Sequence, residues 1–297
     1  MDQPLVIVGP TASGKSSLAL ELAGLVQSVE IVSSDAMAVY RGMDVGTAKP
    51  TVAERGAVPH HLVDVADATE DYTLHRFRTE VADVLDEVEG RGLNVIVVGG
   101  TGLYVQAVVD DFELPGHFPE IRAELEAEPD TDALYRRLQD GDPKAATKME
   151  PTNRRRIIRG LEVVVGTGQP FSSFGPGVDH YGDTRFALVG LEIDRDEMDQ
   201  RIDQRYQQQM DDGFLAEVAT LAEAGISRTA AQALGYRELL AHLQGTISLD
   251  EALDQARRRT KKFARRQQRW FRRDPRITWF EALAPDLVEQ VHAHWRA

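Results

Sequence analysis

A glycine-rich octapeptide near the start of the chain constrains the fold most strongly. It consists of Gly9, Pro10, Thr11, Ala12, Ser13, Gly14, Lys15 and Ser16, and it matches the phosphate-loop pattern. The apolar run at 5–8 predicts a buried strand before it, and helical spacing at 17–26 predicts a helix after it. Such a loop binds a di- or triphosphate through backbone N–H groups, with Lys15 on a phosphate oxygen and Ser16 on a magnesium ion. An ordinary strand–turn–helix junction is the alternative.

Bulk composition excludes several classes of protein. The chain has 297 residues, 42% of them hydrophobic, which suits one large domain or a domain that carries an insertion. It contains no cysteine, which excludes disulfides, thiolate metal sites and cysteine nucleophiles. No apolar run is long enough for a membrane span, and the first strand leaves no room for a signal peptide, so we expect a cytoplasmic protein with no membrane partner. The net charge of −14 argues mildly against a nucleic-acid partner.

Strand and helix patterns alternate along the first part of the chain. Short apolar runs predict strands at 5–8, 30–33, 62–65 and 94–98, and amphipathic spacing predicts helices at 17–26, 74–88 and 103–109. Thr73 is the expected N-cap of the second of these helices. The near-continuous apolar character of 94–98 is typical of a strand buried on both faces. The pattern therefore predicts an α/β fold with a parallel sheet flanked by helices.

The pattern changes near Pro115 and Pro119, where the alternation stops. Residues 120–165 show polar helical patterns without a clear strand, and an apolar strand pattern returns at 185–193. We therefore expect a core domain formed by 1–115 and 184–297, with a helical insertion at 116–183. The end of the chain is mostly helical, with a possible short strand at 277–280.

Asp35 follows the second predicted strand directly. Ligands of open α/β sheets bind outside the carboxyl ends of the strands, so Asp35 is expected to face the phosphate loop. The polar residues that follow strengthen this interpretation: Tyr40, Arg41, Asp44, Thr47 and Lys49. A turn or helix-capping aspartate is the alternative.

The strand predicted at 94–98 ends in Gly99, Gly100 and Thr101, without an acid. Phosphate-loop ATPases usually place an aspartate there to help hold magnesium. Its absence makes nucleotide hydrolysis less favoured. We expect the two glycines and the threonine to allow close approach by a large ligand.

Three basic clusters stand out in this acidic chain. Residues 257–273 contain ten basic residues and no acidic one, and helical spacing puts five on one face: Arg258, Lys262, Arg265, Arg269 and Arg272. A partner rich in phosphates explains this stripe better than a solvated face does. The second cluster is 153–159, where pairing with helix-surface acids is the alternative. The third is the pair Arg201 and Arg205, for which pairing with Asp199 or Asp203 is the alternative.

Five segments together identify a family. The segments 9–16, 34–50, 98–104, 156–163 and 260–272 resemble those of the bacterial tRNA dimethylallyltransferases, also called tRNA isopentenyltransferases. The match runs over nearly the whole chain, and 34–50 is its most specific part. Ala38 stands where many members carry glutamine, and Gly160 stands where alanine is usual.

The resemblance implies a fold like that of the phosphate-loop NTPases, with a helical insertion that grips the tRNA. It implies transfer of a dimethylallyl group to N6 of the adenosine 3′ to the anticodon. The phosphate loop would then hold the diphosphate of dimethylallyl diphosphate, with Mg²⁺ as cofactor. The implied partners are that diphosphate and the anticodon stem-loop of tRNA, and we expect the protein to be a monomer.

The resemblance also implies roles for individual residues. Asp35 would accept the proton of the attacking amine, while Lys15, Arg205 and magnesium on Ser16 would stabilise the leaving diphosphate. The residues expected to contact tRNA are Asp35, Ala36, Met37, Ala38, Thr101, Arg122, Arg155, Arg156, Ile157, Ile158 and Arg159, together with Arg258, Lys262, Arg265 and Arg269 of the basic helix.

Two other functions remain open at this point. A small-molecule kinase could use ATP on the same phosphate loop. A non-catalytic phosphate-loop RNA-binding protein is the other alternative, although it leaves Asp35 without an obvious purpose.

Overall fold

The computed structural model describes residues 3–26, 28–112, 114–175 and 177–297. It divides into two compact units. Unit 1 comprises the chain up to Asp110 and from Asp183 onward, and unit 2 comprises Asp111–Gly182. Each unit is described by itself.

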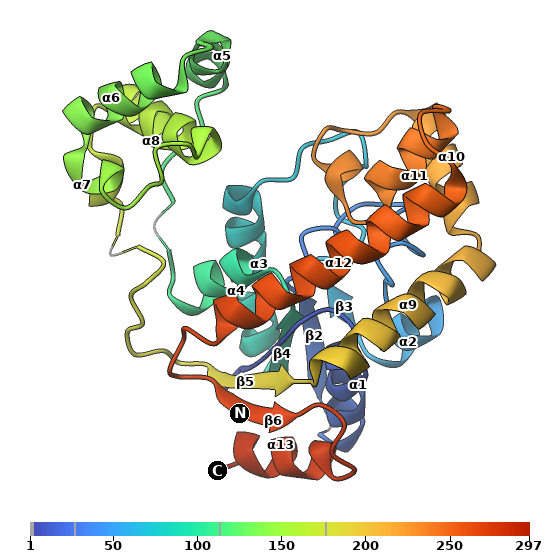
Figure 1. The fold of residues 1–297 in the computed structure, drawn as a ribbon. Coiled ribbons are helices and arrows are strands. Elements are labelled where there is room, and N and C mark those ends of the chain that lie inside the picture. Colours follow the sequence, from blue (N-terminus) through green and yellow to red (C-terminus); the bar gives the residue numbers. More distant parts are fainter. Residues whose placement is uncertain (1–2, 27, 113, 176) are drawn as a thin grey trace. The chain divides into compact units, whose positions relative to one another are not determined.

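Unit 1 is built on a six-stranded sheet with the order β3-β2-β4-β1-β5-β6, and every neighbouring pair is parallel (Figure 1). Its strands are β1 Leu5–Val8, β2 Val29–Ser33, β3 His60–His61, β4 Asn94–Gly99, β5 Ala187–Glu192 and β6 Thr278–Glu281. The predicted parallel α/β fold is confirmed. Because β1 lies between β4 and β5, the phosphate loop that follows it emerges at the centre of the sheet.

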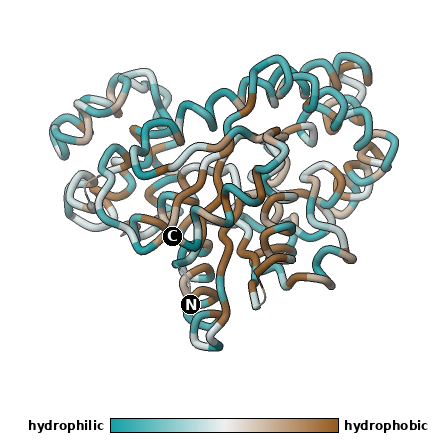
Figure 2. The backbone as a smooth tube through the Cα atoms, turned by 90° about the horizontal axis from the view of Figure 1, so that it is seen from below, coloured by the Kyte–Doolittle hydropathy of each residue, from teal (hydrophilic) through white to brown (hydrophobic). Residues whose placement is uncertain are grey.

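The alternation of side chains along β1 separates two hydrophobic layers. Leu5 and Ile7 pack in the layer that contains α1 (Lys15–Leu25) and α13 (Leu287–Trp295). Val6 and Val8 face the opposite layer, which contains α3 (Leu74–Gly90) and α4 (Gly102–Val109). Both faces of the sheet are therefore covered, as the apolar strands require. Figure 2 shows the hydrophobic strand segments in the interior of this unit and hydrophilic segments on its outer helices.

The remaining helices of unit 1 follow β5, apart from the short α2 (Val52–Ala57). They are α9 Arg195–Asp211, α10 Phe214–Ala224, α11 Tyr236–Leu243 and α12 Leu249–Phe271, with a 3-10 turn at Ala230–Gln232. A capping box between Ser248 and Glu251 begins α12. This long helix packs against α4, α9 and α11 through a buried face that includes Ala256, Ala264 and Phe271 (Figure 1). Most of the basic segment 257–273 therefore lies on a helix that packs onto the rest of unit 1.

The strand predicted at 62–65 is wrong, because β3 is the preceding pair His60–His61. Leu62 and Asp64 adopt left-handed backbone conformations, with φ of 59° and 58°, which interrupt an extended strand. The segment instead bonds to the loop after β2, where the Ala66 N–H donates to the carbonyl of Val39 at 3.0 Å. Other predicted elements of unit 1 are shifted by one or two residues at their ends. The Thr73 N-cap is confirmed, since its side chain accepts from the Arg76 N–H.

Unit 2 is helical over its described residues. It contains α5 Pro119–Ala127, α6 Thr131–Gly141, α7 Pro143–Ala146 and α8 Arg154–Thr167, followed by a 3-10 turn at Phe171–Ser173. Its own small core includes Leu125, Leu134, Leu138, Ile157 and Leu161. Across the described part of both units, no helix combines the length and apolar character that a membrane span needs.

Candidate functional site

The phosphate loop lies between β1 and α1, as the sequence predicts. Ala12 and Gly14 are in the left-handed region, with φ of 65° and 87°, and the Ser13 hydroxyl donates to the carbonyl of Pro10 at 2.9 Å. A left-handed conformation costs a non-glycine residue about 1 kcal/mol or more, and such strain clusters at ligand sites. The helix α1 begins at Lys15, so its positive N-terminus and the loop amides are available to an anion.

Three ionic side chains from three different elements meet at this loop. Burial lowers the pKa of the Lys15 ammonium to about 8; the negative charge of Asp35 raises that pKa, and the positive charge of Arg205 lowers it further. The Lys15 Nζ donates to the carbonyl of Pro10 at 2.5 Å, and the Arg205 Nη1 donates to the Thr11 hydroxyl at 3.0 Å. Burial also lowers the pKa of Arg205. A site with two cations and one carboxylate is thereby assembled around the loop.

Asp35 is half-buried, and its two carboxylate oxygens differ in their hydrogen bonding. One oxygen, Oδ1, accepts the Met37 N–H at 2.8 Å, which is the turn-forming role that the sequence left open. The other oxygen has no hydrogen-bond partner among the described residues and can accept a proton. The turn role and a chemical role are therefore compatible.

The glycines at the end of β4 and just after it make room for side chains of the chain itself, and the expected close approach of a large ligand stays a prediction. A Cβ added to Gly99 would overlap Ser34, one added to Gly100 would overlap Gln267, and one added to Gly102 would overlap Trp270. Side chains of the chain itself occupy this space. Thr101, between them, accepts the Ala36 N–H at 3.2 Å and so connects this turn to the Asp35 turn.

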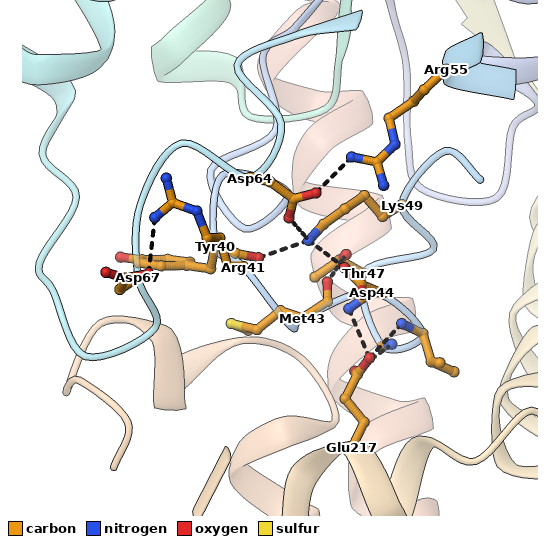
Figure 3. A network of polar contacts seen from close by, with 12 residues as sticks. Tyr40, Arg41, Met43, Asp44, Thr47, Lys49, Arg55, Asp64, Asp67 and Glu217 are labelled. Carbon is orange, nitrogen blue, oxygen red and sulfur yellow. Dashed lines mark hydrogen bonds and ion pairs between the residues drawn. The ribbon is translucent and has the colours of Figure 1, made fainter. Parts of the chain in front are cut away.

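The polar residues after Asp35 mostly hold their own loop together. Figure 3 shows the Lys49 ammonium at the centre of this network. Its side chain is 1% exposed, and it donates to the Tyr40 carbonyl at 2.7 Å and to Asp44 and Asp64 at 2.6 Å each. Arg55 supplies a second cation to Asp64 at 2.6 Å. Lys49, Asp44 and Asp64 are therefore committed to one another, so these polar residues do not by themselves support a ligand beside Asp35.

Glu217 of α10 binds the backbone of the same loop through its carboxylate (Figure 3). Its carboxylate accepts the N–H groups of Asp44, Val45 and Gly46 at 2.7, 2.7 and 3.1 Å and the Tyr236 hydroxyl at 2.6 Å. Glu217 could not be found from the sequence, because its partners are mostly backbone groups that no motif displays. Glycine is required at 46, where a Cβ would overlap Phe214 and Tyr236.

The basic face of α12 differs in part from the predicted stripe. Arg265 is turned toward α9 and pairs with Asp199 at 2.7 Å, and its neighbour Lys261 pairs with Asp203 at 2.7 Å. The alternative that Asp199 and Asp203 pair with Arg201 and Arg205 is therefore wrong. Arg258 and Arg272 are exposed but pair with Asp254 and Glu192. The exposed basic residues of α12 without an ion pair to a described residue are Lys262, Arg266 and Arg269.

Unit 2 presents some of its predicted tRNA-binding residues and buries others. Arg155 and Arg156 are exposed at the start of α8, without an ion pair to a described residue. Arg159 and Arg122 both contact the buried carboxylate of Glu162, at 3.0 and 3.3 Å. Two further predicted residues, Ile157 and Ile158, lie in the core of the unit. The prediction that these two isoleucines contact tRNA is therefore wrong for their side chains, which are buried.

The family model described as IPP transferase matches residues 38–274. This chain belongs to the IPP transferase family. It is 44% identical to the tRNA dimethylallyltransferase of Bifidobacterium animalis subsp. lactis, over 97% of this chain and 85% of that protein. It is 47% identical to the tRNA dimethylallyltransferase of Kineococcus radiotolerans, over 94% of this chain and 91% of that protein.

Comparison with solved structures points to the same family. The tRNA isopentenylpyrophosphate transferase of Bacillus halodurans is 36% identical with a TM-score of 0.73, covering 99% of this chain and 95% of that one. A eukaryotic dimethylallyltransferase that acts on tRNA is 28% identical with a TM-score of 0.82, covering 99% of this chain and 78% of that one. The resemblance stated from the sequence and the phosphate-loop NTPase-like fold are both confirmed.

The donors around the phosphate loop fit a magnesium ion that arrives with a phosphate ligand. Among the described residues, no group of three or more histidine, aspartate or glutamate side chains could hold a metal ion. Ser16 is exposed in the first turn of α1, where its hydroxyl offers one oxygen. Mg²⁺ commonly binds through few protein oxygens, with waters and substrate phosphates as its other ligands.

The pKa of Lys15 predicts how anion binding to the phosphate loop depends on pH. The ammonium attracts an anion only while it is protonated, so raising the pH from 7 to 9 removes one positive charge from the loop. A charge-assisted hydrogen bond contributes roughly 1.5–3 kcal/mol, so we expect inorganic diphosphate to bind about tenfold more weakly at pH 9. Isothermal titration calorimetry across this range measures the effect.

Lys15→Arg is the matched control for this titration, because its guanidinium stays charged at both pH values. Its profile reports the pH effects that do not come from Lys15, including the ionisation of diphosphate itself. Identical profiles for the wild type and the variant would show that Lys15 does not titrate in this range.

Proposed function

We propose that this chain transfers a dimethylallyl group from dimethylallyl diphosphate to N6 of the adenosine 3′ to the anticodon in tRNA, releasing diphosphate. The observation that carries the proposal is the convergence of Lys15, Arg205 and Asp35 on one phosphate loop. Two cations suit a diphosphate leaving group, and a carboxylate beside them suits an amine that must lose a proton. The relatives that this chain matches over most of their length are named tRNA dimethylallyltransferases, and that name agrees with this chemistry.

The reaction requires a base because the exocyclic amine of adenine is a weak nucleophile. As the N6–carbon bond forms, the bond between the allylic carbon and the diphosphate oxygen breaks. The free oxygen of Asp35 accepts the N6 proton in this step, and the electron pair of the broken bond leaves with the diphosphate. The departing group gains negative charge, which Lys15, Arg205 and the loop amides stabilise.

Magnesium belongs to this proposal as a companion of the diphosphate, with Ser16 as its protein ligand. When bound, it neutralises part of the charge on the leaving group. A nucleoside triphosphate is a poorer match to the site, since no acid follows β4 to hold a metal as phosphate-loop ATPases usually do.

Each unit offers its own cations to the RNA. In unit 1 these are Lys262, Arg266 and Arg269 on the outer face of α12, and in unit 2 they are Arg155 and Arg156. Such side chains bind phosphates and position the RNA without reading its sequence. The target adenosine must leave its stack to reach Asp35, as base-modifying enzymes require.

Incubation of the protein with bulk tRNA lacking this modification and labelled dimethylallyl diphosphate tests the proposal. We expect label in the tRNA and one released diphosphate for each group transferred, with no requirement for ATP. A parallel reaction with labelled ATP tests the kinase alternative. Binding of tRNA without transfer of the label would favour the non-catalytic RNA-binding alternative and contradict the proposal.

Asp35→Asn separates the proposed chemistry from the structural role of this residue. The amide oxygen can still accept the Met37 N–H, but the side chain can no longer accept a proton at neutral pH. We expect turnover to fall about 100- to 10,000-fold, while tRNA affinity stays within about twofold because phosphate contacts dominate it. Single-turnover kinetics and filter binding measure the two quantities. A variant with near-normal turnover would exclude Asp35 as the base.

Neutralising Lys262, Arg266 and Arg269 together to glutamine tests the RNA-binding face of α12. Each phosphate contact that is lost removes about 0.7–0.9 from the log–log slope of affinity against salt, so the triple variant should lose about two to three units. Turnover at saturating tRNA should change little, because these side chains are exposed, whereas α12 contacts the phosphate loop through the buried Gln267.

Two adjacent lysines provide the matched control for α12. Lys261→Gln removes a charge that is already paired with Asp203, so the slope should stay as in the wild type. Lys262→Gln should lower it by about one unit. Equal slopes for both variants would show that this face is solvated and does not bind RNA.

A further inference from the structure

Gln267 is the residue of α12 that reaches the phosphate loop. It is buried on the inner face of the helix. Its Oε1 accepts the N–H of Thr11 at 2.9 Å, and its Nε2 donates to the carbonyl of Gly100 at 2.8 Å. Both ends of one carboxamide therefore join the loop after β1 to the turn after β4.

Each of these two partners leads to one of the groups proposed for the chemistry. On one side, the Thr11 hydroxyl accepts the Arg205 guanidinium at 3.0 Å. On the other side, Gly100 is followed by Thr101, whose hydroxyl accepts the N–H of Ala36, the residue after Asp35. The Gln267 carboxamide therefore links Arg205, which is proposed to stabilise the leaving diphosphate, to the turn of Asp35, the proposed base.

The surrounding sequence accommodates this side chain specifically. A Cβ at Gly100 would overlap the Gln267 Nε2, so glycine at this position makes room for the amide. An amide is required because one partner donates and the other accepts. A glutamate would set a carboxylate against the Gly100 carbonyl, and an apolar side chain would leave a buried N–H and a buried carbonyl unpaired.

We propose that Gln267 is a positioning residue, which fixes the phosphate loop and Arg205 at the distance from Asp35 that prenyl transfer needs. This inference rests on the proposed function for the identity of the reaction. The structural link itself runs through Thr11, Gln267, Gly100 and Thr101, and it does not require that Gln267 touch either substrate.

Gln267→Met is the main test, because methionine has a similar length and removes both hydrogen bonds. Thr11 and Arg205 then lose a fixed reference to the Asp35 turn. A misplacement of about 1 Å can cost roughly 100-fold in rate, so we expect kcat/KM for dimethylallyl diphosphate to fall about 10- to 100-fold. The affinity for inorganic diphosphate should fall as well, while tRNA affinity should stay within about twofold, because Gln267 faces away from the exposed side of α12.

Gln268→Met is the matched control on the next residue of the same helix. Its Nε2 donates to the carbonyl of Ile193 at 3.3 Å, outside the phosphate loop. Thermal melting of both variants shows whether each folds, and activity is compared at a temperature where both are folded. Gln267→Glu is a second variant, which keeps the acceptor for Thr11 but cannot donate to Gly100; we expect it to weaken diphosphate binding at least as much.

The proposal is overturned if Gln267→Met keeps kcat/KM and diphosphate affinity within about twofold of Gln268→Met, or if tRNA affinity falls as much as diphosphate affinity. The diphosphate titration is independent of turnover. A wild-type protein that does not transfer the dimethylallyl group would therefore contradict the proposed function, whereas equal diphosphate binding by both methionine variants would contradict only the role of Gln267.

Discussion

The site depends on holding like and unlike charges close together in a partly buried place. Burial makes both charges costly, so the pKa of Lys15 and the pKa of Arg205 are lowered, and the positive charge of Arg205 lowers the pKa of Lys15 further. Asp35 offsets part of this cost. A diphosphate would offset more, because it brings negative charge to the loop amides, the N-terminus of α1 and the two cations.

Side chains outside the chemistry keep these charges in place. Lys49 binds the Tyr40 carbonyl and the carboxylates of Asp44 and Asp64, and Glu217 binds three backbone N–H groups of the same loop (Figure 3). Gln267 joins the phosphate loop to the turn after β4. Buried polar groups must be paired, and a paired group resists displacement. This explains why the segment 34–50 is rich in polar residues although most of them are not free to bind a ligand.

The sequence predicted the features that depend on local pattern. Apolar runs such as Val95–Val98 predicted the parallel sheet because both of its faces are covered, and the octapeptide predicted the strand–loop–helix at Lys15. Features that depend on distant partners were missed. The strand expected at 62–65 gives way to left-handed residues that bring Asp64 to Lys49, and the space beside Gly100 and Gly102 is filled from α12. The outward face of α12 likewise depended on the acids of α9 that pair with Arg265 and Lys261.

The mechanism proposed for this protein requires the phosphate loop to bind the leaving diphosphate beside Asp35. A crystal structure of the protein with inorganic diphosphate and Mg²⁺ is the sharpest test. We expect diphosphate oxygens within hydrogen-bond distance of the Lys15 Nζ, the Arg205 guanidinium and the loop amides, with magnesium between the anion and the Ser16 hydroxyl. We also expect the Lys15 Nζ to leave the Pro10 carbonyl and reach the anion. Diphosphate bound on α12 or in unit 2, with none at the phosphate loop, would rule this mechanism out.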